Sequence, residues 1–308
     1  MEVRTARLRS LAKVNLDLRV LHKRADGYHE LRTVFQSISL SDTIGVSYSA
    51  GPKTSIQMAG NVEIPGNLIE KAAEAILNVS KSKGLIQFNL KKVIPIGGGL
   101  GGGSSNAASV LLALPVLLGK SVPLVKLEEI AANLGSDVTF FLHGGTALGL
   151  GRGTELYPLQ EIRTRRGLLV EPGVHVSTGQ AYEDLARKSV EISAPADFQQ
   201  FLWKLDSGTF GIGVNDFEAV VYKNYPKLRS IHRLLGGAGA SYVRMSGSGS
   251  SIYAFFDGNG PDPGILEGYT VHPIATVSRR QYQKIWRRQL RAHIAPGEKW
   301  PPQSRYAQ

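Results

Sequence analysis

The sequence contains no cysteine among its 308 residues. A disulfide framework, a thiolate zinc site and a cysteine nucleophile are therefore excluded. Long hydrophobic runs are missing too, because the longest, residues 110–118, is interrupted by Pro115 and has about half the length that spans a bilayer. The N-terminal segment also lacks the unbroken apolar core of a signal peptide. We therefore expect a soluble, cytoplasmic protein that works without a membrane.

Acidic residues are scarce at the C-terminal end of the chain. The whole sequence has 36 Lys and Arg against 25 Asp and Glu, a net charge of +11. Between residues 276 and 308, eight basic residues face a single acid, Glu298, so this segment holds +7 of the total and the rest only about +4. Such a weakly basic body does not fit a nucleic-acid binder, whereas a modest positive surplus suits an anionic small substrate.

The composition and the periodicity predict a two-part α+β protein. Apolar residues make up 42% of the chain, which excludes disorder throughout. We expect strands over 7–22, 33–47, 87–94 and 144–160, and helices over 67–81, from 104 onward and over 124–134. The pattern then restarts, with strands over 167–170, 241–245 and 252–256 and helices over 180–187, 198–205 and 225–235. We infer subdomains 1–163 and 164–276 and an extension, 277–308.

One loop is unusually rich in glycine. After Pro95 the chain reads Gly97, Gly98, Gly99, Leu100, Gly101, Gly102 and Gly103, followed by Ser104, Ser105 and an alanine-rich stretch. Glycines let backbone N–H groups approach an anion closely, and Ser and Asn before alanines are typical N-cap residues. The loop therefore predicts a phosphate site at a helix N-terminus. A tight structural turn is the alternative.

Two common nucleotide-binding loops do not fit this pattern. A P-loop needs a lysine before its Ser or Thr, and no lysine lies between residues 93 and 119. Gly97, Gly99 and Gly102 do have the dinucleotide-binding spacing. The acid expected about twenty residues later is missing, however, because the next acid is Glu128. A nicotinamide enzyme is therefore a poor fit.

Five segments match one family in the order and the chemistry of their residues. They are Ala-Lys-Val-Asn-Leu at 12–16, Arg-Ala-Asp-Gly-Tyr-His-Glu-Leu at 24–31, the glycine loop at 95–108, Gly-Ser-Asp-Val-Thr-Phe-Phe at 135–141 and Met-Ser-Gly-Ser-Gly-Ser-Ser at 245–251. Together they resemble the GHMP small-molecule kinase superfamily over about residues 8–258. The Asp-Gly-Tyr-His element is the most specific of them, because sister kinases of the superfamily lack it.

The resemblance implies a fold and a reaction. The fold has an N-terminal ribosomal protein S5-like subdomain and a C-terminal ferredoxin-like subdomain, with the active site between them. The reaction transfers the γ-phosphate of ATP, with Mg²⁺, to the 2-hydroxyl of 4-diphosphocytidyl-2-C-methyl-D-erythritol in the non-mevalonate route to isoprenoid precursors. The Asp-Gly-Tyr-His element argues against a kinase of homoserine or mevalonate. The retained Lys13, Asp137 and glycine loop argue against a ligand sensor without catalysis. A monomer and a homodimer both stay open.

The resemblance also implies roles for single residues. Lys13 and Asp137 form the catalytic pair, in which Asp137 either deprotonates the acceptor hydroxyl or orients it. Tyr28 stacks on cytosine and His29 reads the edge of the base. Further substrate contacts are expected from Asn15, Thr178 and Tyr182, adenine contacts from Asn67 and Lys92, and phosphate or Mg²⁺ contacts from Ser105, with which Ser104 could exchange roles. The turn at 246–251 completes the cleft.

The resemblance ends before the C-terminal segment. There, near-helical spacing relates Tyr282, Ile285, Trp286 and Leu290. We expect a helix whose apolar stripe docks on its own subdomain or on a second subunit, in preference to a basic amphipathic segment that touches a membrane or nucleic acid. Prolines at 296, 301 and 302 indicate a frayed end.

Overall fold

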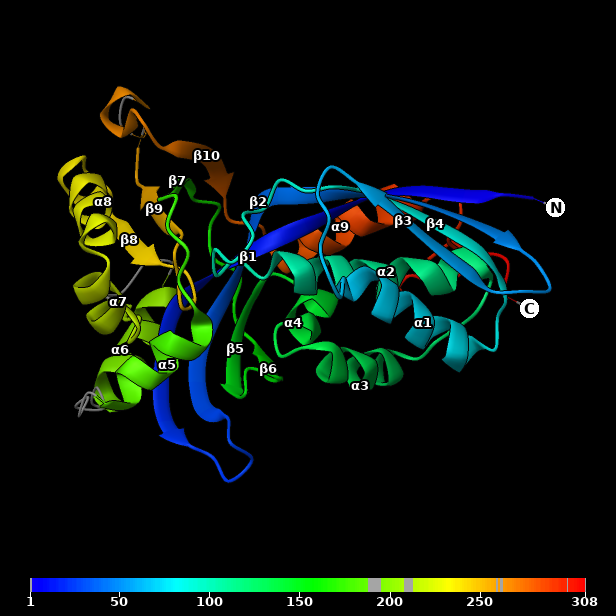
Figure 1. Cartoon of the computed structure of the whole chain (residues 1–308), viewed down its shortest axis with the longest axis horizontal. Coiled ribbons are helices and arrows are strands. Elements are labelled where there is room, and N and C mark those ends of the chain that lie inside the picture. Colours follow the sequence, from blue (N-terminus) through cyan, green and yellow to red (C-terminus); the bar gives the residue numbers. More distant parts are fainter. Residues whose placement is uncertain are drawn as a thin grey trace.

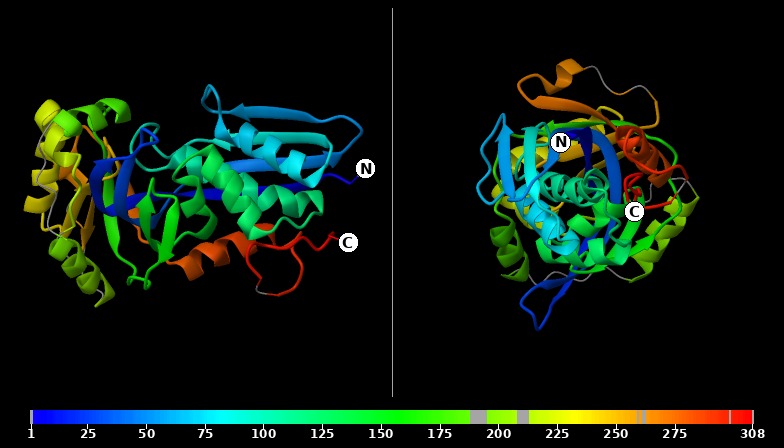
Figure 2. Two further views of the ribbon diagram at one scale, coloured as in Figure 1. Left: turned by 90° about the horizontal axis from the view of Figure 1, so that it is seen from below. Right: turned by 90° about the vertical axis from the view of Figure 1, so that its right-hand side faces the viewer.

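Two mixed subdomains lie end to end in the computed structural model, which describes residues 2–187, 195–207, 213–258, 260, 263–297 and 299–307 (Figure 1). Both chain termini lie at the far end of the N-terminal subdomain, away from the C-terminal one (Figure 2). The predicted α+β fold is confirmed.

The N-terminal subdomain is built on one long hairpin. Strands β1 (Arg4–Lys23) and β2 (His29–Ala50) pair antiparallel along most of their length. On its other edge β2 pairs with β4 (Gly84–Lys91) through its second half and with β5 (Thr146–Gly151) through its first half. Strands β3 (Ser55–Gly60) and β6 (Glu155–Pro158) complete a six-stranded sheet. Because β1 is long, it reaches from this sheet into the second subdomain (Figure 1).

Four helices of the first half share the core of this sheet: α1 (Leu68–Ser80), α2 (Gly102–Leu118), α3 (Leu124–Leu134) and α4 (Val138–His143). Helix α2 is buried on nearly every side, which explains why its sequence is apolar all round. The predicted Ser and Asn caps of this helix are wrong. Its N-cap is Gly101, in the left-handed conformation (φ 66°), and Ser104 and Ser105 lie inside the helix.

The C-terminal subdomain has an antiparallel sheet in the order β10–β7–β9–β8, formed by β7 (Arg166–Glu171), β8 (Tyr242–Met245), β9 (Ile252–Phe256) and β10 (Thr270–Ala275). Helices α5 (Thr178–Arg187), α6 (Pro195–Asp206), α7 (Glu218–Asn224) and α8 (Pro226–Gly237) and the 3₁₀ helix η1 (Pro263–Leu266) surround it. Sequence reasoning missed β3, α4, α7 and β10. In β10, Pro273 argues against a strand, but β10 is an edge strand and an edge tolerates proline.

Helix α9 (Arg279–Leu290) and the chain after it pack on the N-terminal subdomain. Tyr282, Trp286 and Leu290 are at most 1% exposed within its core, and the Tyr282 hydroxyl donates to the Phe141 carbonyl. The prediction that this helix docks on its own chain is confirmed.

The predicted frayed end is wrong for the described residues. Pro301 and Pro302 are buried, the Ala295 N–H donates to the Gln303 carbonyl (2.8 Å), and the Ser304 hydroxyl donates to the Val116 carbonyl (2.8 Å). The first bond closes the segment on itself, and the second ties it to helix α2. The subdomain boundaries 1–163 and 164–276 stay predictions. In the described part of the chain, none of the helices has both the length and the apolar character that crossing a membrane requires.

Candidate active site

A cleft of about 520 Å³ lies between the two subdomains and contains the predicted site. The N-terminal subdomain lines it with Lys13, Asn15, Leu18, Gly27, Tyr28, His29, Leu31, Gly99, Gly101, Ser136, Asp137 and Arg152. The C-terminal subdomain adds Thr178, Gly179, Tyr182, Phe217, Gly247 and Ser248. Every residue predicted to be catalytic or to contact the phosphate acceptor therefore lines this one cleft.

Strand β1 carries two polar side chains into the cleft. Lys13 and Asn15 line it, whereas residues 12, 14 and 16 pack into the core between the subdomains, as the alternation of a strand requires. The Lys13 ammonium lies 3.4 Å from Asp137 Oδ2 and donates to Asn15 Oδ1 (2.7 Å). Lys13 is only 3% exposed, so these two oxygens compensate a charge that is largely shielded from water.

Asp137 lies at the junction of two helices. Helix α3 ends at Leu134 and α4 begins at Val138, and the Asp137 side chain makes no capping bond to α4. Its carboxylate is 30% exposed and lines the cleft. A reachable carboxylate held against a buried ammonium can accept or orient the proton of a substrate hydroxyl.

The glycine loop uses backbone angles that favour glycine. Gly97, Gly99 and Gly101 all have left-handed backbone angles, with φ of 70°, 76° and 66°. A Cβ atom on Gly99 would lie 1.9 Å from the Ser246 carbonyl oxygen, and one on Gly101 would lie 2.8 Å from the Phe141 ring. Side chains are excluded here because the loop is packed between the 246–251 turn and α4.

The glycine loop is also fixed to the catalytic strand. Leu100 is buried, and its carbonyl accepts from the Lys13 N–H (3.1 Å). The Ser246 hydroxyl donates to the Gly99 carbonyl (2.8 Å), and the Ser251 N–H donates to the Gly98 carbonyl (3.3 Å). Helix α2 starts directly after the loop, so its N-terminal N–H groups provide a place for phosphate.

Three predicted contact residues, Ser105, Asn67 and Lys92, make structural interactions in this structure. The Ser105 hydroxyl is buried and donates to the Leu11 carbonyl (2.6 Å), so it points away from the cleft and does not suit Mg²⁺. Asn67 caps α1 by accepting from the Ile69 N–H (3.1 Å).

Lys92 pairs with buried Asp42 (2.8 Å) below the start of α2, and burial lowers the pKa of its ammonium. Neither Asn67 nor Lys92 lines the cleft, and their adenine contacts stay predictions. Ser104, half-buried on the first turn of α2, is better placed than Ser105 for a phosphate or Mg²⁺.

Aromatic rings gather at the end of the cleft formed by the β1–β2 turn. The His29 ring stacks on Tyr182 with 4.7 Å between centroids, and Tyr182 meets Phe217 edge-on at 4.8 Å. Burial lowers the pKa of the His29 imidazole, so it is neutral near pH 7. Burial, with a smaller effect of nearby Asp137, raises the pKa of Tyr182 to about 12. Tyr28 is 53% exposed, which leaves its ring accessible to a ligand.

The structure adds residues that sequence reasoning missed. Arg152, in the turn between β5 and β6, lines the cleft with its guanidinium 4.6 Å from the centre of the Tyr28 ring. Its position between Gly151 and Gly153 was the available signal, since glycines on both sides of a cation mark an exposed turn. Thr178, which was predicted, lines the same cleft, and its hydroxyl lies 2.9 Å from the Ser248 hydroxyl, which joins α5 to the 246–251 turn.

Comparison with known families defines the class of protein. Residues 67–145 match the family described as GHMP kinases N terminal domain, and residues 201–266 match GHMP kinases C terminal. The solved homoserine kinase of Cytophaga hutchinsonii has the same fold, with a TM-score of 0.64 at 16% identity over 89% of this chain and 95% of that one. The fold is that of the GHMP kinases, as the motifs predicted.

Closer relatives narrow the family. The chain is 48% identical to a 4-diphosphocytidyl-2-C-methyl-D-erythritol kinase of Solibacter usitatus over 98% of both chains, and 39% identical to one of Geobacter sulfurreducens over 81% of this chain and 89% of the relative. A crystal structure of 4-(cytidine 5'-diphospho)-2C-methyl-D-erythritol kinase superposes with a TM-score of 0.76 at 32% identity, over 88% of this chain and 98% of the other. The chain belongs to the family of 4-diphosphocytidyl-2-C-methyl-D-erythritol kinases.

Proposed function

We propose that this protein transfers the γ-phosphate of ATP to the 2-hydroxyl of 4-diphosphocytidyl-2-C-methyl-D-erythritol, a step toward isoprenoid precursors. The observation that carries the proposal is the pairing of Lys13 with Asp137 at 3.4 Å, in a cleft that also contains the glycine loop and the His29–Tyr182 stack. A substrate with an acceptor hydroxyl at one end and a nucleobase at the other requires this combination. The names of the relatives support the same substrate.

The catalytic pair acts by position and charge. Asp137 accepts a hydrogen bond from the acceptor hydroxyl and takes or orients its proton. Lys13 holds the carboxylate in place and adds positive charge where the phosphoryl group passes. Asn15 fixes the Lys13 ammonium through the 2.7 Å hydrogen bond to its Oδ1. Because phosphoryl transfer needs little covalent help from the protein, this alignment accounts for most of the catalysis.

The glycine loop and the first turn of α2 hold the phosphates of ATP. Among the described residues there is no cluster of three or more His, Asp or Glu that could bind a metal alone. This fits Mg²⁺, which kinases bind through substrate phosphates with one or two protein oxygens. Ser104 is the residue that would hold it beside the phosphates of ATP, and when bound it would neutralise charge on the transferred phosphoryl group.

The aromatic end of the cleft selects the cytidine group. Tyr28 offers an exposed ring on which a base stacks. The neutral His29 imidazole carries one donor and one acceptor nitrogen, which suits the polar edge of cytosine. Arg152 provides a cation near the diphosphate.

We further propose that the protein works in the cytoplasm as a monomer or homodimer, with small molecules as its only partners. The apolar stripe of α9 supports this, because Tyr282, Trp286 and Leu290 are used in the core and are not available to a membrane.

The test is a substrate comparison. The purified protein is incubated with ATP, Mg²⁺ and the diphosphocytidyl substrate, homoserine or mevalonate, and the release of ADP is measured. We expect turnover with the diphosphocytidyl substrate alone, and a phosphomonoester in the product by ³¹P NMR. Turnover with homoserine or mevalonate instead, or with none of the three, contradicts the proposal. Lys13→Met serves as the inactive control, because it keeps an unbranched side chain of similar size and removes the charge.

A further inference from the structure

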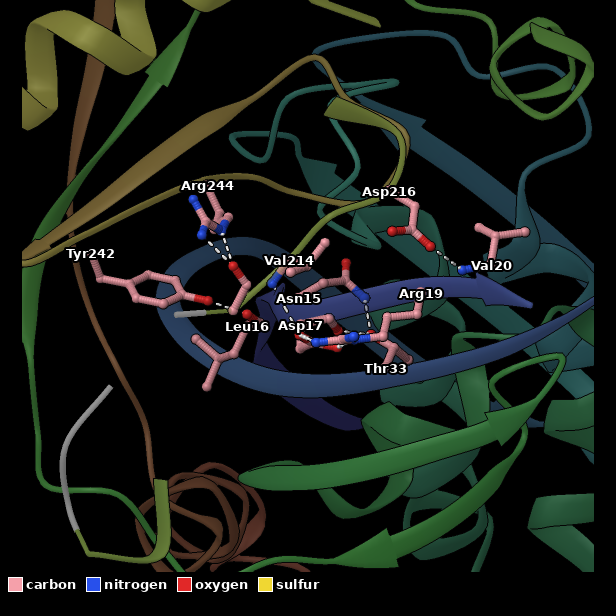
Figure 3. Close-up of polar contacts among 11 residues, drawn as sticks. Asn15, Leu16, Asp17, Arg19, Val20, Thr33, Val214, Asp216, Tyr242 and Arg244 are labelled. Carbon is pink, nitrogen blue, oxygen red and sulfur yellow. Dashed lines mark hydrogen bonds and ion pairs between the residues drawn. The ribbon is translucent and has the colours of Figure 1, made fainter. Parts of the chain in front are cut away.

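Residues 213–216 fasten the C-terminal subdomain to the catalytic strand. The Leu18 N–H donates to the Val214 carbonyl (2.7 Å), the Asp216 N–H donates to the Leu18 carbonyl (3.0 Å), and Asn215 forms a parallel bridge with Leu18. The segment therefore runs beside β1 like a short additional strand (Figure 3). The residues of β1 that it contacts, Asp17, Leu18 and Val20, lie four to seven residues along the strand from Lys13, the catalytic lysine.

Buried side chains strengthen this attachment. Asp17 Oδ2 accepts from the Val214 N–H (2.9 Å), and the same carboxylate pairs with Arg19 at 3.0 Å, where both side chains are at most 1% exposed. Asp216 Oδ2 accepts from the Val20 N–H (2.8 Å) (Figure 3). Hydrogen bonds on both sides of Asn215 thus fix its backbone relative to β1.

The Asn215 side chain then reaches the turn that follows β8. Its Nδ2 group donates to the carbonyls of Met245 and Gly247, at 2.8 Å each, and its Oδ1 accepts from the Phe217 N–H (3.1 Å). Asn215 is 4% exposed. Both N–H groups and the oxygen of the Asn215 amide are therefore hydrogen-bonded to backbone. The two N–H groups hold the turn in place.

That turn leads back to the catalytic residues. The Gly247 N–H donates to Asn15 Oδ1 (3.0 Å), the same oxygen that accepts from the Lys13 ammonium (2.7 Å). Asn15 is held from its other end, since its Nδ2 donates to the Thr33 hydroxyl (2.8 Å). The position of the Gly247 peptide consequently decides how Asn15 presents its oxygen to Lys13.

We propose that Asn215 is a positioning residue for phosphoryl transfer: it fixes the turn at 245–247 so that the Gly247 N–H and Lys13 share Asn15 Oδ1, which aims the ammonium at Asp137. The inference rests on the proposed function. Asn215 lies behind the turn, and its effect passes through Gly247 and Asn15 to Lys13. The substrate end of the cleft is linked to Asn215 through Phe217, which packs on Tyr182 and whose N–H donates to Asn215 Oδ1, the atom that Asn215→Asp keeps.

The decisive variant is Asn215→Asp, which keeps the shape and the Oδ1 acceptor. Its carboxylate places an oxygen against two carbonyl oxygens, whereas the protonated acid can donate to one of them. The charged groups around it are acidic Asp17, Asp216 and Glu218 and basic Arg19 and Arg244. Burial raises the pKa of all three neighbouring acids. We expect burial to raise the pKa of the carboxyl group introduced by Asn215→Asp as well.

We expect kcat of Asn215→Asp to be roughly tenfold or more below wild type at pH 8, with KM for the diphosphocytidyl substrate changed less than about threefold. Relative to wild type at each pH, the loss shrinks as the pH falls toward 6, because the protonated acid regains one hydrogen bond. Asn215→Ser, whose hydroxyl can donate once, loses activity without this pH dependence. Folding of each variant is checked by circular dichroism and thermal unfolding.

Asp216→Ala is the matched control, since it removes one hydrogen bond of the segment to β1 but keeps the two backbone bonds to Leu18, the Val214–Asp17 bond and the Asn215 contacts to the turn. We expect it to lower the melting temperature and to change kcat less than about threefold. An Asn215→Asp variant with wild-type kcat at pH 8, a loss that is the same at every pH, or an equal kcat loss in Asp216→Ala overturns the inference. Absence of turnover in the wild type overturns the proposed function instead, so the two failures are distinguishable.

Discussion

At the scale of single residues, the two members of the catalytic ion pair differ in their exposure to solvent. Lys13 is 3% exposed, whereas the Asp137 side chain keeps 30% of its surface. A buried ammonium must stay paired, so Lys13 is fixed, and the carboxylate it holds remains open to a substrate. The pair therefore combines rigidity with access.

The role of Asp137 can be tested by removing its charge. Asp137→Asn keeps the shape of the side chain but cannot take a proton, so we expect turnover to fall by roughly 10² or more, the usual effect of a positioned acid or base. ATP binding by calorimetry is expected to stay within about threefold of wild type. Turnover near the wild-type value removes Asp137 from the mechanism.

Substitutions of the two residues in the proposed cytidine pocket are expected to have different effects on substrate binding. Tyr28→Ala removes a stacking surface and is expected to weaken the diphosphocytidyl substrate by about 1–3 kcal/mol, with little effect on ATP. His29→Ala removes edge contacts, so discrimination between cytidine and uridine forms of the substrate declines. Calorimetric titration with both forms measures this. Unchanged binding in both variants shows that the base is held elsewhere.

At the scale of elements, the glycine loop links the two subdomains as well as offering N–H groups to phosphate. It contacts β1 through Leu100 and the 246–251 turn through Gly98 and Gly99. The close approach of backbone to backbone explains the density of glycine better than flexibility does.

Gly99→Ala tests this close packing. The new Cβ would meet the Ser246 carbonyl at 1.9 Å and also requires a left-handed φ of 76°, so the loop must move away from the turn. We expect ATP affinity to fall roughly tenfold or more, measured by titration with a non-hydrolysable analogue. Gly268→Ala is the control, because Gly268 has a similar φ of 85° with open space around it. If ATP affinity falls equally in both variants, the loss comes from backbone strain alone.

The C-terminal helix α9 is a second element whose role only its packing reveals. Its basic residues lie on a helix whose apolar side is in the N-terminal core. We expect Trp286→Ala to lower the free energy of unfolding by about 3–5 kcal/mol, the usual cost of truncating a buried tryptophan. Trp203→Ala, at a site 72% exposed, is expected to cost less than about 1 kcal/mol in the same urea titration. A small effect at Trp286 means that α9 is dispensable for stability.

At the scale of the whole molecule, one strand belongs to both subdomains. Residues 12, 14 and 16 of β1 pack against Leu169, Tyr253 and Phe255 of the second sheet, while the same strand pairs with β2 in the first. The Tyr253 hydroxyl donates to the Asn15 carbonyl (2.7 Å), which adds a polar contact across the junction. The cleft is therefore formed on a shared core and its two walls are held together beside the catalytic lysine.

Global stability is expected to depend on pH through His232 in the C-terminal subdomain. Burial lowers the pKa of this imidazole from 6.5 to about 4, so the unfolded chain binds its proton first as the pH falls. The contribution is present above pH 6.5 and is lost as the pH falls toward 4. Because the ring is partly exposed, we expect a loss of about 1 kcal/mol between pH 7 and 5.

His232→Phe removes this titration and keeps a ring in the same place. Urea unfolding of wild type and variant at pH 7 and pH 5 measures the difference. We expect the variant to lose less stability than wild type over this interval. Parallel losses in both proteins contradict the assignment to His232.

The amino-acid sequence by itself determined the chemistry of the site and the identity of the longer elements. Lys13, Asp137, Tyr28 and His29 were predicted because the segments that contain them resemble the GHMP kinases in order and chemistry. The glycine-rich loop was identified from its composition, and the structure shows positive φ angles at Gly97, Gly99 and Gly101, which only glycine adopts without strain. Short or edge elements such as α4 and β10 carry too few residues for a periodic signal.

Tertiary structure alone decided which distant segments meet and which way a side chain points. The Ser105 hydroxyl points to the Leu11 carbonyl and Asn67 caps a helix, although both follow patterns that fit ligand contacts. Asn215 reaches Lys13 through a turn and a second asparagine, and no spacing in the sequence encodes that path. The physical reason is that local pattern sets the type of each element, whereas its neighbours depend on how the whole chain buries its apolar surface and satisfies its buried polar groups.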